Sequence, residues 1–176
     1  MREPEPDIVG RARAGDLAAF EELVRSHQGD VYRLALHLVR DRQTAEDVTQ
    51  EAFLLAFRSL PRFRGGSKFS TWLYRIARNC AVDAIRRRER RRRLERTAVE
   101  DVPGADPSVR AALEAAVDGL PRELREGFVV IEVFGLSYAE ASAVLGVLPG
   151  TLKSRMHRAR RLLMEALDDR AASGEV

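Results

Sequence analysis

The sequence predicts an all-α protein made of two small helical domains joined by a flexible linker. Apolar residues recur with the spacing of amphipathic helices along most of the 176 residues, and no segment shows the convincing alternation of a strand. From Glu89 to Ser108 this periodicity gives way to charged residues, and Pro103, Gly104 and Pro107 close the stretch. A charged segment that ends in helix-breaking residues is typical of a linker.

Each side of the linker has room for four helices. The spacing predicts helices over 16–28, 30–40, 44–59 and 70–88 before the linker, and over 109–118, 122–134, 138–145 and 149–167 after it. The first ten residues are predicted to form a loose polar start. We therefore expect a first domain over residues 1–88, the linker over 89–108, a second domain over 109–170 and a tail over 171–176.

Residues 137–164 predict a helical hairpin with one cationic face. Ser137 and Glu140 fit a capping box at a helix start, and Gly146 allows the chain to turn before Pro149 opens the next helix. A short helix that turns cations outward is suited to a DNA major groove, and a solvated basic surface is the alternative. The predicted apolar arc of this helix is Leu148, Leu152, Met156, Ala159 and Leu163, and the opposite arc is Lys153, Ser154, His157, Arg158, Arg160 and Arg161.

The helix that begins near Thr44 has an acidic face with one exposed leucine. Acids around an apolar anchor suit docking onto a basic partner surface, although a solvated face with a stray leucine explains the pattern as well. The predicted buried stripe is Ala45, Val48, Ala52, Leu55 and Ala56, and the nearly opposite face is Asp47, Gln50, Glu51, Leu54 and Arg58.

The segment from Arg62 to Arg88 combines aromatic, amide and cationic groups. Its loop mixes Phe63 and Phe69 with Arg62, Arg64 and Lys68, which is the chemistry that holds unstacked bases of single-stranded nucleic acid. Each aromatic residue taken singly is explained as well by packing in a core. The helix that follows is predicted to place Trp72, Arg75, Asn79, Asp83 and Arg86 on one side, and Leu73, Ile76, Ala77, Cys80 and Ala84 on its buried stripe.

Composition narrows the class of partner and gives no positive reason to expect an enzyme. The formal charge is only +3, but residues 86–96 hold eight Arg and two Glu, a density that favours nucleic acid. The single cysteine, Cys80, excludes an intrachain disulfide, and His27, His37 and His157 fit no metal-ligand pattern. Neither a membrane span nor a signal peptide is evident. We therefore expect a cytoplasmic protein without a cofactor.

In this order, these motifs resemble the extracytoplasmic-function (ECF) sigma factors, the compact two-domain group of the sigma-70 family. The resemblance covers roughly residues 16–167, and its most specific parts are the D-x-x-Q-E pattern at Asp47, Gln50 and Glu51 and the run TWLYRIARN at 71–79. LuxR-type regulators end in a helix-turn-helix similar to the one after the linker. Here, however, the segment that precedes it is similar to sigma region 2.

The resemblance implies a role for each surface. The D-x-x-Q-E helix, with Leu54, is implied to dock on the β′ clamp helices of core RNA polymerase, and the β flap is a second implied contact. Promoter DNA is the other implied partner, and many relatives are held inactive by an anti-sigma factor, although no residue here identifies one. The implied −10 contacts are Phe63, Lys68, Phe69, Thr71, Trp72, Arg75, Asn79, Asp83 and Arg86, and the implied −35 contacts are Thr151, Lys153, Ser154, Arg155, His157 and Arg158.

Two positions depart from the family's pattern. Proline usually follows the Gly-Val of the turn directly, whereas Leu148 intervenes here before Pro149, which can shift the residues that face the groove. Gly65 and Gly66 stand where an acidic residue is common, so the choice of −10 base stays open. Arg155 lies beside the apolar arc, where it is either structural or reaches a phosphate.

The sequence thus predicts a promoter-specificity subunit that reads −35 DNA as duplex and captures melted −10 DNA. The main alternative is a helix-turn-helix regulator that binds duplex DNA as a dimer without polymerase, which symmetric half-sites would favour. A weaker alternative is an RNA-binding adaptor that uses the Arg-rich segment.

Overall fold

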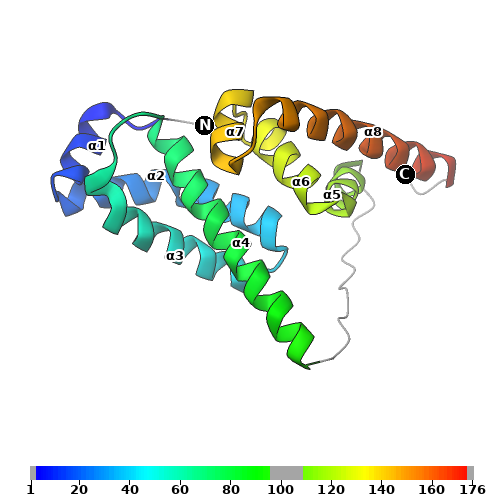
Figure 1. The fold of residues 1–176 in the computed structure, drawn as a ribbon, viewed down its shortest axis with the longest axis horizontal. Helices are drawn as coiled ribbons and strands as arrows, with labels where there is room; N and C mark the ends of the chain where they lie inside the picture. Colours follow the sequence, from blue (N-terminus) through cyan, green and yellow to red (C-terminus); the bar gives the residue numbers. More distant parts are fainter. Residues whose placement is uncertain (1–2, 96–108, 174–176) are drawn as a thin grey trace.

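The computed structural model describes residues 3–95 and 109–173, and within these ranges all regular structure is helical (Figure 1). The all-α prediction is confirmed. The N-terminal half comprises α1 (Pro6–Arg13), α2 (Leu17–Val39), α3 (Arg42–Ser59), the 3-10 helix η1 (Leu60–Arg62) and α4 (Phe69–Glu95). The C-terminal half comprises α5 (Val109–Gly119), α6 (Arg122–Phe128), the π-helical turn η2 (Val129–Val133), α7 (Tyr138–Leu145) and α8 (Pro149–Ser173).

Helices α2, α3 and α4 form a bundle, because each has an apolar stripe that the other two cover. The sequence predicts two helices over 16–40, but α2 runs unbroken through Gly29. A glycine inside a helix costs about 1 kcal/mol relative to alanine. Leu23, Val31 and Leu34 are fully buried on both sides of it, and their burial outweighs that cost.

Side-chain caps fix where α2 and α3 begin. The carboxylate of Asp16 accepts a hydrogen bond from the Ala19 amide at 3.1 Å, and that of Asp41 accepts one from the Thr44 amide at 2.8 Å. The hydrogen bonds from the Thr44 hydroxyl and amide lower the pKa of Asp41. Helix α3 therefore starts at Arg42, two residues before the predicted start.

Three further boundaries differ from the prediction, and one is the end of α8, which lies at Ser173 instead of residue 167 and within the predicted tail over 171–176. The polar start contains a helix, α1, which has proline in its first turn and Arg11 and Arg13 in its last turn, where they complement the helix dipole. Helix α4 continues to Glu95 rather than ending at Arg88, since arginine and glutamate are good helix formers. Of the predicted linker, residues 96–108 lie outside the described part of the chain.

In the C-terminal half, α6 and α8 approach closely because Gly127 has no side chain. A β-carbon at Gly127 would lie 3.1 Å from Cδ1 of Leu152. Leu152, Met156, Ala159 and Leu163 of α8 are buried, which confirms four of the five residues of its predicted apolar arc. The predicted capping box is also present: Ser137 Oγ accepts from the Glu140 amide at 3.3 Å, and the Glu140 carboxylate accepts from the Ser137 amide at 2.9 Å.

The two halves pack against one another, with α7 beside the N-terminal part of α4 (Figure 1). Tyr74 of α4 and Phe134, which follows η2, meet edge to face with ring centroids 5.6 Å apart, and both are buried. Arg40, at the end of α2, donates to the Asp118 carbonyl at 3.0 Å and pairs with the Asp118 carboxylate at 3.2 Å. The N-terminal and C-terminal halves are therefore in direct contact.

Gly146 should be sensitive to substitution because of its backbone conformation alone. It ends α7 with φ 66°, whereas Gly150 lies in the first turn of α8, and a β-carbon would meet nothing within 4 Å at either glycine. We expect Gly146→Ala to lower the free energy of unfolding by about 1 kcal/mol, since the left-handed region disfavours alanine. The matched control Gly150→Ala should raise it slightly. Urea unfolding measures both, and equal effects would contradict this account.

Candidate nucleic-acid interface

The exposed side of α8 carries most of the predicted duplex contacts. Thr151, Lys153, Ser154, His157 and Arg158 are all exposed on one helix that is anchored by its buried stripe. Arg155 is different, because its guanidinium donates to the Glu123 carboxylate of α6 at 2.8 Å and its side chain is 22% exposed. In this arrangement Arg155 holds α8 against α6.

Leu148 does not belong to the buried stripe, so that part of the prediction is wrong. Its side chain is 75% exposed. Leu148 precedes the first residue of α8, and its carbonyl accepts the hydrogen bond from the Leu152 amide at 3.0 Å. A residue in this capping position lies outside the helical repeat, and so a projection at 100° per residue does not apply to it.

An aromatic cluster joins the loop before α4 to the first turn of that helix. The ring centroid of Phe63 lies 5.1 Å from that of Trp72, and that of Phe69 lies 5.6 Å from Trp72. Phe63 and Trp72 are half-buried at the surface. Phe69 is only 3% exposed and Thr71 only 4%, so their side chains belong to the core rather than to a surface that DNA could reach. Of the predicted aromatic contacts, two remain accessible.

The outer side of α4 is open and polar. Arg75, Asn79, Asp83 and Arg86 are exposed, as the helical spacing predicts. Asp83 and Arg86 form an exposed ion pair at 3.7 Å, which contributes little to stability. Together with Trp72 these side chains provide a stacking surface, an amide that can pair with a base edge, and two guanidinium groups.

The acidic face of α3 is also exposed. Asp47 and Gln50 are exposed and Leu54 is 59% exposed, whereas Glu51 is half-exposed and pairs with Arg87 at 3.2 Å. One residue of the predicted buried stripe of α3 is wrong. The Leu55 side chain is 41% exposed, and Phe53 is buried instead. An exposed leucine among acids is thus a feature of the folded surface.

A carboxylate from the C-terminal half contacts Lys68 of the loop. Glu140 accepts from Lys68 Nζ at 2.8 Å while it also closes the capping box of α7. The hydrogen bond from Lys68, followed by those from Ser137, lowers the pKa of Glu140 to about 2. Since this folded-state pKa lies below the ordinary value of 4.5, the contact stabilises the fold at neutral pH and is lost only as the pH falls towards 2.

Arg78 of α4 is held in the same way by Glu126 of α6. The Glu126 carboxylate accepts from Arg78 at 2.8 Å and from Arg122 at 2.8 Å, and its side chain is only 4% exposed. Helical spacing in the sequence does not single out Arg78 or Glu126 as a contact between the halves. The one local signal is the spacing of Arg122 and Glu126, which are four residues apart on one helix.

Burial shifts the pKa of two groups inside the fold. It raises the pKa of the Cys80 thiol to about 11, and Cys80 is 4% exposed on the buried side of α4. Burial also lowers the pKa of Arg125, whose guanidinium donates to the Asp118 carbonyl at 3.0 Å. Both groups pack inside the fold. Across residues 3–95 and 109–173, no three His, Cys, Asp or Glu side chains gather as a metal site would require.

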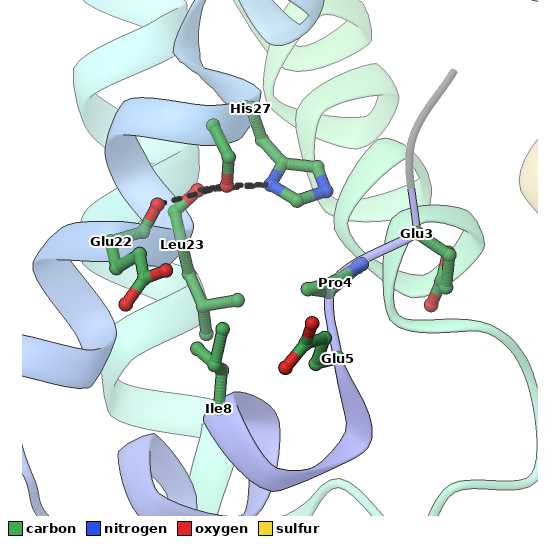
Figure 2. Close-up of a pocket in the computed structure, with 8 residues that line it drawn as sticks. Glu3, Pro4, Glu5, Ile8, Glu22, Leu23 and His27 are labelled. Carbon is green, nitrogen blue, oxygen red and sulfur yellow. Dashed lines mark hydrogen bonds between the residues drawn. The ribbon is translucent and has the colours of Figure 1, made fainter.

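The N-terminal segment covers a cavity of about 260 Å³ beside α2 (Figure 2). His27 lines it, with Nδ1 lying 2.8 Å from the Ser26 hydroxyl and 3.0 Å from the Leu23 carbonyl. Glu3, which also lines the cavity, accepts hydrogen bonds from the Phe69 amide at 2.6 Å and the Ser70 hydroxyl at 2.5 Å. These contacts tie the N-terminal segment to the start of α4.

Comparison with known proteins matches both halves. Sigma-70 region 2 matches residues 23–91, and sigma-70 region 4 matches residues 110–163. The ECF RNA polymerase sigma factor SigE of Mycolicibacterium smegmatis is 41% identical over 94% of this chain and 70% of its own length. The RNA polymerase sigma-H factor of Pseudomonas aeruginosa is 34% identical over 94% of this chain and 95% of its own length.

Two solved structures share the fold. The sigma factor RpoE of Bartonella quintana, in complex with the anti-sigma factor NepR, has a TM-score of 0.75 and 27% identity over 85% of this chain and 96% of that chain. CnrH, in complex with the cytosolic domain of CnrY, has a TM-score of 0.71 and 28% identity over 92% of this chain and 96% of that chain. No helix among the described residues is long and apolar enough to cross a membrane.

The contact between the halves should depend on Glu126. Glu126→Ala removes the partner of Arg78 across the boundary between the halves, at a cost of about 2 kcal/mol for a charged hydrogen bond. That cost should shift the equilibrium towards separated halves by roughly thirtyfold. Small-angle X-ray scattering should show a larger radius of gyration for the full chain.

The matched control is Glu123→Ala on the same helix. Glu123 is 72% exposed and pairs with Arg155 within the C-terminal half, so its loss should leave the radius of gyration unchanged. Identical scattering from wild type and Glu126→Ala would show that the buried carboxylate does not hold the halves together.

Proposed function

This chain belongs to the ECF group of the sigma-70 family of RNA polymerase sigma factors, and from that premise we propose which surface performs each step of promoter recognition. Its function is promoter-specific transcription initiation. The observation that best supports this proposal is that one chain combines an acidic face with an exposed leucine, an aromatic and cationic loop, and an exposed helix-turn-helix. A self-sufficient dimeric regulator has no need of the first two, and residues 23–91 match sigma region 2.

The acidic face of α3 is the proposed docking surface for core polymerase. Asp47, Gln50 and Glu51 surround the exposed Leu54, so the face offers charges for orientation and one apolar anchor to bury. The resemblance assigns the β′ clamp helices as its partner. We assign the β flap to the C-terminal half on the same ground.

The loop and α4 are the proposed site for the melted −10 strand. Phe63 and Trp72 supply half-buried rings for stacking, and Asn79 supplies an amide for a base edge. Lys68, Arg75 and Arg86 face the backbone phosphates. Lys68 is paired with the Glu140 carboxylate in this structure. When the halves separate, a phosphate of the −10 strand replaces Glu140 as the partner of Lys68.

The exposed side of α8 is the proposed −35 reader. Lys153 and Arg158 can contact base edges in the major groove, with Thr151, Ser154 and His157 beside them. Arg155 is assigned to the α6 contact instead. Two weak contacts on one chain reinforce each other through effective concentration.

The protein performs no covalent step in this proposal, because strand opening draws on captured bases and polymerase contacts. It works in the cytoplasm, where core polymerase and the chromosome meet. An anti-sigma factor is a proposed inhibitor, since RpoE and CnrH are each solved in complex with another protein, which for RpoE is a named anti-sigma factor.

Reversing the charge of the docking face should abolish holoenzyme formation. Asp47→Arg with Glu51→Arg changes the face from acidic to basic, which repels a basic partner. Glu21→Arg with Glu22→Arg makes the same change in net charge on α2, where both residues are exposed, and should have no effect. Co-purification with core polymerase measures docking. If both double variants bind equally well with unchanged helical content, the docking surface lies elsewhere.

Substitution of the −35 reader should weaken promoter binding by the holoenzyme. Arg158→Ala and Lys153→Ala should each cost roughly 1 to 3 kcal/mol if the residue reads a base edge. A residue that contacts only phosphate should weaken all sequences alike and flatten the salt dependence. Arg161→Ala, an exposed cation further along α8, is the control. Unchanged affinity and selectivity in both variants would exclude α8 as the reader.

Strand opening tests the proposal most fully. Capturing an extruded base must offset a few kcal/mol of unstacking, and an aromatic stack contributes about 1 to 3 kcal/mol. Asn79→Ala and Phe63→Ala should therefore slow opening, as measured by permanganate reactivity of unpaired thymines with polymerase present. A template mismatched across −10 should rescue a melting defect more than a base-reading defect. Wild-type opening in both variants, with docking intact, would refute the −10 assignment.

A further inference from the structure

The leading end of α8 presents an apolar side chain to solvent. Leu148 is 75% exposed, more than any other large apolar side chain that the structure describes. Isolated exposed apolar residues are common, so exposure alone assigns nothing. The position is informative, because residues at the N-terminus of a recognition helix are those that meet base edges in helix-turn-helix proteins.

The backbone holds Leu148 in a fixed place. On one side, the amides of Gly146 and Val147 donate to the Ser142 carbonyl at 2.9 and 3.2 Å. On the other side, the Leu148 carbonyl accepts from the Leu152 amide at 3.0 Å. Pro149 further restricts Leu148 to extended conformations. An apolar contact made from such a backbone costs little additional ordering.

The chemistry of this end of the helix limits what it can recognise. Leu148, Pro149 and Gly150 have no side-chain hydrogen-bond donor or acceptor, and the first hydroxyl follows at Thr151. Gly150 is exposed, and a β-carbon placed there would meet no atom within 4 Å, so the surface at this end of the helix is open. The apolar group that the major groove offers is the C5-methyl of thymine.

We propose that Leu148 is a specificity-determining residue that packs on the C5-methyl of one thymine in the −35 element. The inference rests on the proposed role of α8 as the −35 reader. It gives Leu148, which stands between the Gly-Val of the turn and Pro149, a function: the leucine adds a preference for thymine at the base pair nearest the leading end. Polar readout by Lys153 and Arg158 then applies to the base pairs that follow.

The test removes the methyl from the DNA and the leucine from the protein. Holoenzyme assembled from the full chain and core polymerase selects duplexes from a pool randomised across the −35 region. Each thymine of the selected duplex is then replaced singly by deoxyuridine. At one position, wild-type holoenzyme should bind the deoxyuridine duplex roughly fourfold more weakly than the thymine duplex. That factor is the one expected for one methyl-sized apolar contact.

Two substitutions and a control complete the cycle. Leu148→Ala and Leu148→Ser should bind thymine and deoxyuridine duplexes equally at that position. Leu148→Ser also offers a better helix cap, so a folding defect would not explain its lost discrimination. Met164→Ala, which removes a 65% exposed apolar side chain further along α8, should keep the wild-type discrimination.

The proposal is overturned if the Leu148 variants discriminate thymine from deoxyuridine as the wild type does, or if no single deoxyuridine weakens wild-type binding. In either case, if the wild-type holoenzyme still selects a −35 sequence, the proposed role of α8 as the −35 reader stands. If wild-type holoenzyme selects no −35 sequence at all, the proposed role of α8 fails and the Leu148 assignment fails with it.

Discussion

The buried carboxylate of Glu126 constrains how the two halves of this chain are arranged. A charge with 4% of its side chain exposed is tolerated only when it is paired, and Arg78 and Arg122 provide the pairing from opposite sides of the domain boundary. Separation of the halves breaks the Arg78 contact, but it also returns both charges to water. The interaction therefore fixes how the two halves sit against each other when they are packed, and it still allows them to separate.

This packed state uses Lys68, a group that the proposed −10 site needs. Lys68 is paired with Glu140, and Arg78, which directly precedes Asn79 of that site in the sequence, is paired with Glu126. Two promoter elements one and a half to two helical turns apart are separated by roughly 50 to 70 Å. We infer that the two halves separate when both elements are bound. In this proposal, DNA and polymerase contacts replace the carboxylates, which couples promoter recognition to separation of the halves.

Features set by local chemistry could be predicted from the sequence. The capping box at Ser137, the turn at Gly146 and the exposed face of α4 follow from residues within a few positions of each other. The partners of Lys68 and Arg78 could not, since each lies at least 48 residues away and a single sequence holds no record of that proximity. The sequence left the burial of Phe69 open as an alternative and did not predict the exposure of Leu148, for a related reason. Helical periodicity assigns a face but does not apply at a capping position or in a loop.

The distance between the halves tests this account most directly. Spin labels at cysteines introduced at the exposed positions Gln43 and Ala143 report on α3 and α7, and the buried native Cys80 thiol, with its pKa raised to about 11, should stay unlabelled. Pulsed electron paramagnetic resonance should give one well-defined distance in the free chain and a distance tens of ångströms longer in holoenzyme bound to promoter DNA. The same distance in both states would contradict the requirement for separation.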